Sequence, residues 1–385
     1  MIDWDRVEQF IGFGRRDAPV VFIGMEEGLK EARSLDGDLA IRSSYEVQVM
    51  DLKEAHRGIA GSESYFDPDH APRQPTWRVM ADLMLRRAGM AHPTGDDRRR
   101  YRALNLGREH GDTLLTELLP YPHPKASDWL YERFGRHLTR EAYVAAMLPA
   151  RKRLLRDVLA ESPRELVVCY GKTHWGHYQG LFDDANWREN GPFRIGERRG
   201  TRDILTTHFS DRGFNTDKQL ARFAFIALSH VELKPPNQYT AAELSIIEAS
   251  VRRGGEVNED TLSDNLRRAQ RIAIAREGQR IISVCALKRV FARHNRNVST
   301  SSGYALPDDA AEFGYVFTEE AYRGRGYGSL ATAALLDGLR CVYATARTGN
   351  VEMRRILLKN NFQEIERSWR SREHAGESIT LWTRK

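Results

Sequence analysis

Three short, mainly apolar runs stand out in the first part of the chain, at residues 20–23, 166–170 and 204–207. Runs of this length are typical of strands that are buried on both faces of a sheet. Between them, apolar residues recur with helical spacing, as at 76–88 and 141–160. Strands that alternate with helices predict a three-layer α/β/α domain with a mainly parallel sheet, in which ligands bind at the carboxyl ends of the strands.

The pattern changes at residues 232–238, where Pro235 and Pro236 interrupt regular structure. The apolar residues 223–228, just before this point, are interpreted as a strand. After the prolines, Thr240 and Glu243 have the spacing of a helix-capping box, which predicts the start of a new helix. The sequence therefore predicts two domains, at residues 1–232 and 238–385.

The composition is that of a globular protein, because 41% of the 385 residues are hydrophobic and 29% are charged. No apolar window is long enough to cross a membrane, and the first residues lack a signal-peptide pattern. A cytoplasmic protein without a membrane partner is expected. The net charge of +6 is compatible with a nucleic-acid partner and also with many ordinary enzymes.

The three cysteines, Cys169, Cys285 and Cys341, lie far apart in strand-like runs. This placement predicts buried, reduced thiols. Three cysteines cannot complete a four-cysteine metal site or hold an iron–sulfur cluster, so neither a metal nor a cluster is expected.

The strongest local signal is a glycine-rich turn at residues 323–328, between the strand-like run 312–317 and an amphipathic helical stretch. Glycines allow the backbone to approach a diphosphate closely, and the free N–H groups of a helix N-terminus bind anions. Arg323 and Arg325 add positive charge. The turn therefore predicts a diphosphate-binding site.

Arg323, Gly326 and Gly328 form an Arg-x-x-Gly-x-Gly pattern that resembles the acyl-coenzyme A-binding motif of the GNAT superfamily. Residues 341–346 resemble the family's next strand, and residues 350–362 match its following helical motif in length and hydrophobic pattern. Over 238–385 the resemblance implies an α+β GNAT fold and an N-acyltransferase that uses acetyl-coenzyme A or another acyl-coenzyme A. The binding residues that it implies are Phe317, Arg323, Gly324, Arg325, Gly326, Tyr327, Gly328 and Asn350.

Two positions depart from the family pattern. The tyrosine that often protonates the leaving thiolate falls on Leu357, and the glycine before Phe362 is Asn361. Tyr343, Tyr327 or a water molecule is then the candidate general acid. For the base that removes a proton from the amine, the resemblance implies Glu312, with Glu319 and Glu320 as alternatives that are also typical of solvated or helix-capping acids.

Four segments of the first domain together resemble the uracil-DNA glycosylase superfamily, in the family's order. They are residues 24–28, 116–117, 167–171 and 208–211, and the match covers about residues 15–230. The resemblance implies that Glu26 replaces the water-activating residue and that Glu117 replaces the asparagine that recognises the base. It also implies Glu26 and His208 as catalytic residues and a base pocket made of Gly24, Met25, Glu26, Glu117, His208 and Ser210.

The altered residues change the expected ligand. An asparagine amide both donates and accepts hydrogen bonds, whereas a carboxylate only accepts. Uracil is therefore expected to be a poor ligand, and a base with amino or N–H donors a better one. Two simpler interpretations stay open: His208 caps a strand end, and His174 and His177 belong to a pocket wall, since they lack further ligands for a metal.

The two resemblances together predict an enzyme, an N-acyltransferase that modifies an amine of a nucleic acid, with DNA as the expected partner and the glycosylase-like domain recognising it. A first alternative is a glycosylase for a base other than uracil, with an accessory acetyltransferase. A second alternative is a protein N-acetyltransferase whose glycosylase-like domain is an inactive binding module. Abasic sites in damaged DNA would favour the first, and acetylation of a protein without nucleic acid would favour the second.

Overall fold

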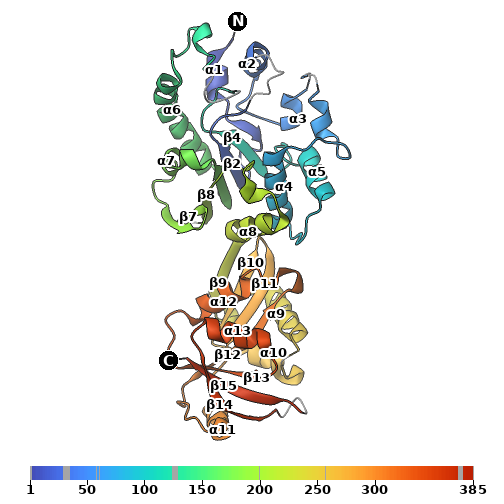
Figure 1. Cartoon of the computed structure of the whole chain (residues 1–385), viewed down its shortest axis with the longest axis vertical. Coiled ribbons are helices and arrows are strands. Elements are labelled where there is room, and N and C mark those ends of the chain that lie inside the picture. The colour runs from blue at the N-terminus through green and yellow to red at the C-terminus, as the bar shows by residue number, and fades with distance from the viewer. Residues whose placement is uncertain are drawn as a thin grey trace. The chain divides into compact units, whose positions relative to one another are not determined.

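The computed structural model describes residues 2–28, 35–57, 59, 61–123, 129–198, 200–255, 257–371 and 376–384. The chain forms two compact units, each described separately below (Figure 1). Unit 1 comprises Met1–Leu85 and His92–Phe223, and unit 2 comprises Arg86–Ala91 and Ala224–Lys385. The fold class is α/β, as the pattern of apolar residues predicts.

The division lies earlier in the chain than the prolines suggest. Strand β9 (Ser229–Lys234) pairs with β10 (Arg271–Glu277), so the residues just before Pro235 belong to the sheet of unit 2. Residues 223–228, interpreted as a strand, form the end of helix α8 (Asp217–Leu228). Leu220, Phe223, Ala224 and Ala227 are all buried, and their spacing is that of one helical face, which explains the error.

Unit 1 is built on an eight-stranded sheet with the order β3-β1-β4-β2-β5-β8-β7-β6. Its four central strands are parallel, and the predicted strands correspond to β2, β5 and β8. The bounds are β1 (Gly12–Gly14), β2 (Val20–Gly24), β3 (Val49–Met50), β4 (Thr113–Glu117), β5 (Leu166–Tyr170), β6 (Asn186–Asn190), β7 (Phe193–Arg198) and β8 (Thr201–Thr206). Strands β6 and β7 form an antiparallel hairpin that extends one edge.

Helices cover both faces of this sheet, and Figure 1 shows α6 and α7 on one side and α4 and α5 on the other. Val21 and Ile23 of β2 pack into a core with residues of α6, while Phe22 contacts Phe209 on the opposite face. The helices of unit 1 are α1 (Trp4–Gln9), α2 (Leu35–Ser43), α3 (Leu52–Ala55), α4 (Pro75–Arg87), α5 (Gly95–Leu104), α6 (Arg140–Ala160), α7 (Trp175–Gln179) and the greater part of α8. The predicted helices 76–88 and 141–160 are confirmed as α4 and α6.

Unit 2 contains a seven-stranded sheet with the order β14-β15-β13-β12-β11-β10-β9. Only β12 and β13 pair in parallel, and the other neighbours are antiparallel. The remaining bounds are β11 (Arg280–Leu287), β12 (Ala311–Thr318), β13 (Val342–Arg347), β14 (Gln363–Arg370) and β15 (Ser378–Arg384). The sheet is therefore mixed, with its parallel pair of strands near the centre.

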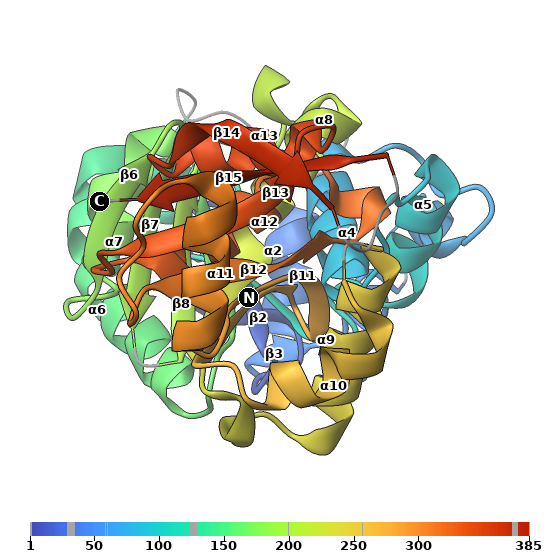
Figure 2. The same cartoon turned by 90° about the horizontal axis from the view of Figure 1, so that it is seen from below.

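Five helices pack against the sheet of unit 2. They are α9 (Ala241–Arg253), α10 (Glu259–Arg267), α11 (Ala292–Ser302), α12 (Tyr327–Leu336) and α13 (Val351–Lys359). Apolar residues of α9 and α10 pack with one set of sheet residues, and those of α12 and α13 pack with another. Figure 2 shows these two pairs of helices on opposite sides of the strands. The predicted capping box of Thr240 and Glu243 is present at the start of α9.

Two of the three cysteines match the prediction. Cys169 and Cys285 are buried, but Cys341 is exposed. Cys341 has a φ of 58° and precedes β13, so it lies in the turn before the strand and outside the core. Among the described residues, no helix has the length and apolarity needed to cross a membrane, and no group of His, Cys, Asp and Glu side chains could hold a metal ion.

Candidate functional site

Unit 2 contains a cavity of about 1140 Å³ at the point where β12 and β13 separate. The two strands pair only at Ala311–Val342 and Glu312–Tyr343, and the residues that follow on both strands line the cavity. A bulge on the other side of β12 places Tyr315 and Val316 opposite the single residue Cys285. Such a bulge twists the strand locally, so the bulge and the separation together open the sheet beside Glu312.

One end of the cavity is formed by the glycine-rich turn. Gly324 and Gly326 have φ angles of 74° and 104°, which side chains rarely adopt. Gly326 is also the N-cap of α12, where it supplies no capping side chain, and Gly328 and Ser329 line the cavity beside it. An uncapped helix N-terminus that opens onto a cavity is suited to an anion. The residues present therefore fit a diphosphate group.

Six of the eight residues that the sequence predicts to bind the coenzyme line the cavity. Those that line the cavity are Phe317, Arg323, Gly324, Gly326, Gly328 and Asn350. The side chains of Arg325 and Tyr327 correct the prediction, because they are not part of the lining. The Arg325 guanidinium lies over the Tyr322 ring at 5.0 Å, and the Tyr327 hydroxyl donates to the buried carboxylate of Glu277. Both side chains therefore hold the turn through contacts on the side away from the cavity.

The support behind the turn includes residues that the sequence pattern does not reveal. Glu277 is buried, and burial raises its pKa while the Tyr327 hydroxyl opposes that effect. Arg325 donates to the Ala91 carbonyl, and buried Arg86 donates to the same oxygen at 2.7 Å. Residues far away in the sequence therefore hold the turn in place, and no local motif marks them.

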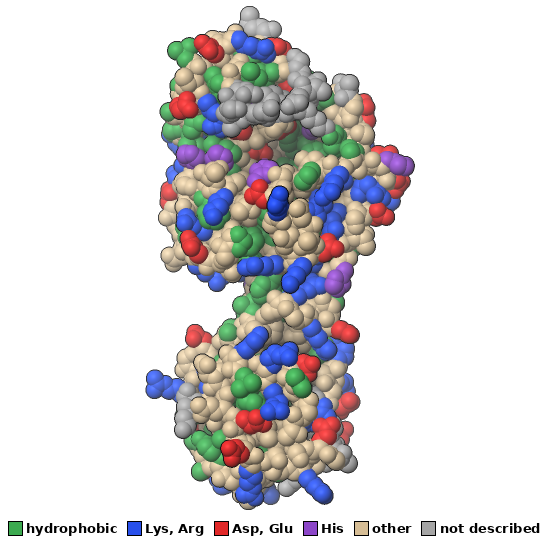
Figure 3. Space-filling view, in the orientation of Figure 1, with side chains coloured by type: hydrophobic (Ala, Val, Ile, Leu, Met, Phe, Trp, Pro, Cys, Tyr) green, Lys and Arg blue, Asp and Glu red, His purple; other side chains and the backbone are tan. Residues whose placement is uncertain are grey.

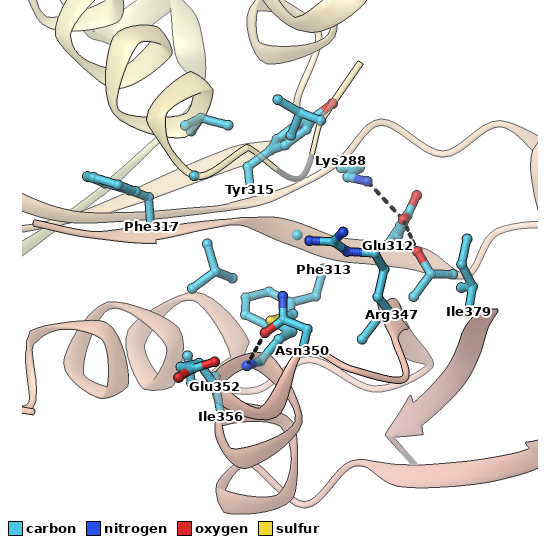
Figure 4. Close-up of a pocket in the computed structure, with 18 of the residues that line it drawn as sticks. Lys288, Glu312, Phe313, Tyr315, Phe317, Arg347, Asn350, Glu352, Ile356 and Ile379 are labelled. Atoms are coloured by element: carbon cyan, nitrogen blue, oxygen red, sulfur yellow. Dashed lines mark hydrogen bonds and ion pairs between the residues drawn. The ribbon is translucent and has the colours of Figure 1, made fainter. Parts of the chain in front are cut away.

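The opposite part of the cavity contains a charged cluster around Glu312 (Figure 4). Lys288 Nζ lies 2.8 Å from Glu312 Oε1, and the Thr345 hydroxyl donates to the same oxygen at 3.2 Å. His294 Nε2 lies 3.4 Å from Glu312 Oε2. Burial alone would raise the pKa of Glu312, but Lys288 and His294 outweigh burial and lower it to about 2. Glu312 is thus a stable anion at neutral pH.

Asn350 and Asn361 have clear structural roles. The Asn350 side chain accepts a hydrogen bond of 2.9 Å from the Met353 amide, so it caps α13 at the edge of the cavity. Asn361 has a φ of 63°, in the left-handed region that asparagine tolerates better than other side chains. This conformation explains why asparagine can occupy a position where the related motif has glycine. Leu357 is fully buried in the core of unit 2.

Tyr343 lies outside the cavity. Its ring is buried, its hydroxyl donates to Asn295 Oδ1 at 2.8 Å, and burial raises its pKa. The prediction that Tyr343 protonates the leaving group is therefore corrected: its hydroxyl is engaged within the fold. Tyr343 has the same alternation along β13 as Thr345, which lines the cavity, but it lies where β12 and β13 are still paired, and its ring packs with Leu381 and Val298.

In unit 1 the predicted base pocket lies at the carboxyl ends of the central strands. Glu117 ends β4 beside Gly24 at the end of β2, and the Tyr170 hydroxyl donates to Glu117 Oε1 at 3.0 Å. A Cβ at position 24 would lie 2.1 Å from Glu117 Oε2, so only glycine leaves room for this carboxyl group. The ring of His208 lies 5.7 Å from the ring of Tyr170. The ends of four strands, β2, β4, β5 and β8, therefore bring these residues together.

Glu26, Ser210 and Met25, the other residues predicted for this pocket, have different surroundings. Glu26 pairs with Arg140 at 2.6 Å through Oε2, while its Oε1 is buried and has no hydrogen-bond partner among the described residues. The Ser210 amide donates to His208 Nδ1, which lies 2.7 Å from the Ser210 hydroxyl. The Met25 side chain is buried in the core of unit 1, which corrects its assignment to the pocket.

The electrostatics of Glu117 change its chemistry. The pKa of Glu117 is raised to about 8, mainly by burial and also by the neighbouring carboxylates Glu27 and Glu26, while the hydrogen bond from Tyr170 opposes this shift. At neutral pH Glu117 is therefore a carboxylic acid, which donates one hydrogen bond and accepts others. The expectation that this residue only accepts does not hold below about pH 8. Its role in recognising a base stays a prediction.

No protein-family model matches the sequence, and no curated protein matches it. Among solved structures, the chain is similar over 40% of its length to a GNAT-family acetyltransferase from Bacillus cereus, with 14% identity, 98% of that chain covered and a TM-score of 0.30. It is also similar over 40% of its length to ElaA from Escherichia coli, with 12% identity, 99% covered and a TM-score of 0.29. A third similar structure is NAA60 from Arabidopsis thaliana in complex with a bisubstrate analogue. The similarity covers 40% of this chain and 96% of NAA60, with 13% identity and a TM-score of 0.31. The chemistry proposed for the chain rests on its own cavity and side chains.

Proposed function

We propose that unit 2 is an acyl-coenzyme A-dependent N-acyltransferase of the GNAT type. The observation that carries this proposal is the cavity itself, which connects the uncapped N-terminus of α12 at Gly326 with the charged cluster around Glu312. An anionic diphosphate suits the first feature, and an amine that must lose a proton suits the second. Both features lie in one continuous space that is large enough for a coenzyme and an acceptor together.

The separated strands suggest how the coenzyme arm binds. Among the described residues, β12 does not pair with β13 beyond Glu312, so its main-chain groups on that side are open to the cavity. An extended chain that carries amide groups can hydrogen-bond to such a strand edge as an added strand would. The pantetheine arm of coenzyme A has this chemistry. In this proposal, the thioester lies near Glu312 when the diphosphate lies at the start of α12.

We further propose that the acceptor amine belongs to a nucleic acid or a modified base, with DNA as the first candidate. The part of the cavity away from the glycine-rich turn contains the cations Lys288, Arg289, Arg347 and Arg370, against the acids Glu312 and Glu377. Lys288 pairs with Glu312 and Arg347 pairs with Glu377, which leaves an excess of positive charge. This excess suits an acceptor that carries phosphate.

The surface supports a diffuse contact with such a partner. Figure 3 shows Lys and Arg side chains spread among acidic side chains over the visible face of both units. In this proposal unit 1 holds the base at Glu117 and His208. The alternative, in which unit 1 removes a base itself, is favoured by the placement of Glu26 at the same sheet edge as Glu117.

The deciding experiment uses labelled acetyl-coenzyme A. The full chain is incubated with DNA, with RNA and with cell protein, and each fraction is analysed by mass spectrometry. Label in DNA or RNA, absent with the Gly326→Glu variant, supports the proposal. Label only in protein favours the binding-module alternative, and abasic sites without any transferred label favour the glycosylase alternative.

A further inference from the structure

We propose that His294 is the catalytic base of the acyl transfer and that Glu312 is a positioning residue that orients it. This inference rests on the proposed function of unit 2. It goes beyond the resemblance to known acyltransferases, which implies Glu312 as the base. Its basis is the arrangement of His294, Glu312, Lys288 and Thr345 in the cavity.

The geometry distinguishes the two members of the His294–Glu312 pair. Glu312 is 7% exposed, and both of its oxygens are already engaged, Oε1 by Lys288 and Thr345 and Oε2 by His294. The His294 side chain is 52% exposed and lines the cavity. The imidazole is therefore the member of the pair that a bound amine can reach.

The charges point in the same direction. The ion pair with Lys288 and the contact with His294 keep Glu312 ionised, because they lower its pKa to about 2 despite burial. A carboxylate of such low basicity removes a proton from an amine poorly. Histidine is the side chain that most often serves as a general base. In the described part of the chain, His294 contacts the Glu312 carboxylate of β12, and Lys288, which follows β11, pairs with the same carboxylate.

The pair also fixes the tautomer. Because His294 Nε2 faces the carboxylate, a neutral imidazole carries its proton on Nε2 and donates it to Glu312 Oε2. The lone pair is then on Nδ1, which is free to accept a proton. A carboxylate orients the histidine base of serine hydrolases by the same principle, with the roles of the two ring nitrogens exchanged.

The reaction balances with these groups. The nitrogen of a neutral amine attacks the thioester carbonyl carbon, and a C–N bond forms. The nitrogen gives one proton to His294 Nδ1, the C–S bond breaks, and the electron pair leaves with the sulfur. The thiolate takes a proton from water, and the His294 imidazolium returns its proton to the solvent. An amide and free coenzyme A result, and no oxidant or reductant is needed.

Helix α11 holds His294 in position. The next residue, Asn295, is buried, and its amide group donates to the carbonyls of Pro307, Asp308 and Ala310 at 2.9–3.1 Å. The helix start is therefore anchored to the loop before β12, which is the strand that carries Glu312. The hydrogen bonds of Asn295 thus connect the helix that carries His294 to the loop that leads into the strand of Glu312.

The test compares His294→Gln with the control His230→Gln. His230 is also a half-exposed histidine beside a glutamate, 3.6 Å from Glu232, but it is not part of the cavity lining. With acetyl-coenzyme A and sheared DNA, His294→Gln should lower kcat about 100-fold, as expected for loss of a general base, and added imidazole should restore part of the rate. The control should match the unaltered protein, and calorimetric affinity for acetyl-coenzyme A should be unchanged in both.

A second measurement needs no acceptor. Nitrogen-15 NMR of histidine-labelled protein should show His294 with its proton on Nε2, and Glu312→Ala should convert this signal to a mixture of tautomers. A proton on Nδ1 in the unaltered protein would overturn the inference, and so would full activity of His294→Gln with an unchanged pH profile. Failure of the unaltered protein to bind acetyl-coenzyme A would instead remove the proposed function, so the two failures are distinguishable.

Discussion

The Tyr343 hydroxyl donates a hydrogen bond of 2.8 Å to Asn295 Oδ1, and Asn295 directly follows His294. Strand β13 is thereby tied to the start of helix α11. Tyr343 contributes to the site through this contact with Asn295, because its own hydroxyl does not face the cavity. A residue that the family resemblance suggests as an acid is thus a support for the helix that carries the proposed base.

Tyr343→Phe should destabilise the protein without removing an acid from the reaction. The change leaves the buried Asn295 oxygen without its donor, which costs about 1–3 kcal/mol. Chemical denaturation should show this loss in unit 2. The alkaline limb of the pH–rate profile should keep its position, whereas loss of a catalytic acid would displace it. Tyr304→Phe, at a partly buried tyrosine in the same cluster, serves as the control.

Gly326→Ala should abolish measurable binding of acetyl-coenzyme A. The φ of 104° strains any side chain, and the added Cβ would lie 3.3 Å from the Phe225 ring. The control is Gly338→Ala, because Gly338 also has a positive φ of 66° but has no neighbouring atom within 4 Å of the added Cβ. Isothermal titration calorimetry measures both variants. Equal affinity in the two would contradict the assignment of the turn.

Glu117 should make the stability of unit 1 depend on pH. Its folded-state pKa of about 8 is higher than the ordinary value of 4.5, so the folded state binds the proton more tightly than the unfolded state. This contribution is fully present below pH 4.5 and is lost as the pH rises to about 8, with a slope of at most about 1.4 kcal/mol per pH unit. In Glu117→Gln the decline should be absent, and exposed Glu109→Gln should retain it. Thermal unfolding across this pH range tests the difference.

Arg289 and Arg370 should contribute to acceptor binding by charge alone. Both are exposed residues that line the cationic part of the cavity. Replacing each by glutamine should weaken DNA binding and reduce the slope of log K against log salt by about one for each phosphate contact that is lost. Arg296→Gln is the control, because Arg296 lies on α11, pairs with Asp308 and is not in the lining. A flat salt dependence in the unaltered protein would favour a protein acceptor.

Cys341 should be the fast-reacting thiol of the chain. It is exposed, whereas Cys169 and Cys285 are buried and burial raises the pKa of each thiol, to about 12 for Cys285. A maleimide should therefore modify one cysteine in the folded protein and three after denaturation. Peptide mapping identifies the modified position, and rapid modification of Cys169 would contradict the packing of β5.

The sequence predicts the glycine-rich turn and the buried strands well because their signals are local. A glycine that needs a positive φ, such as Gly326, and a strand buried on both faces, such as β2, are encoded by adjacent residues. The strand interpretation of 223–228 failed because all six of its residues are apolar, and such a short run does not distinguish a helix from a strand.

The rest of the candidate site depends on contacts between distant residues. His294 meets Glu312 because α11 and β12 are brought together by the loop that Asn295 anchors, and no spacing in the sequence encodes that distance. The chemistry of Glu117 was also mispredicted from its residue type. Its protonation depends on burial and on Glu26 and Glu27 nearby, which are properties of the folded unit.

The Arg86–Ala91 segment gives unit 2 a discontinuous chain. The backbone passes between the two units at three places, after Leu85, after Ala91 and after Phe223. A protease that cuts once near residue 223 therefore separates residues 224–385 from the Arg86–Ala91 segment, which stays in the other fragment. A fragment that begins at Ala224 would be missing the Ala91 carbonyl that holds Arg325 behind the glycine-rich turn.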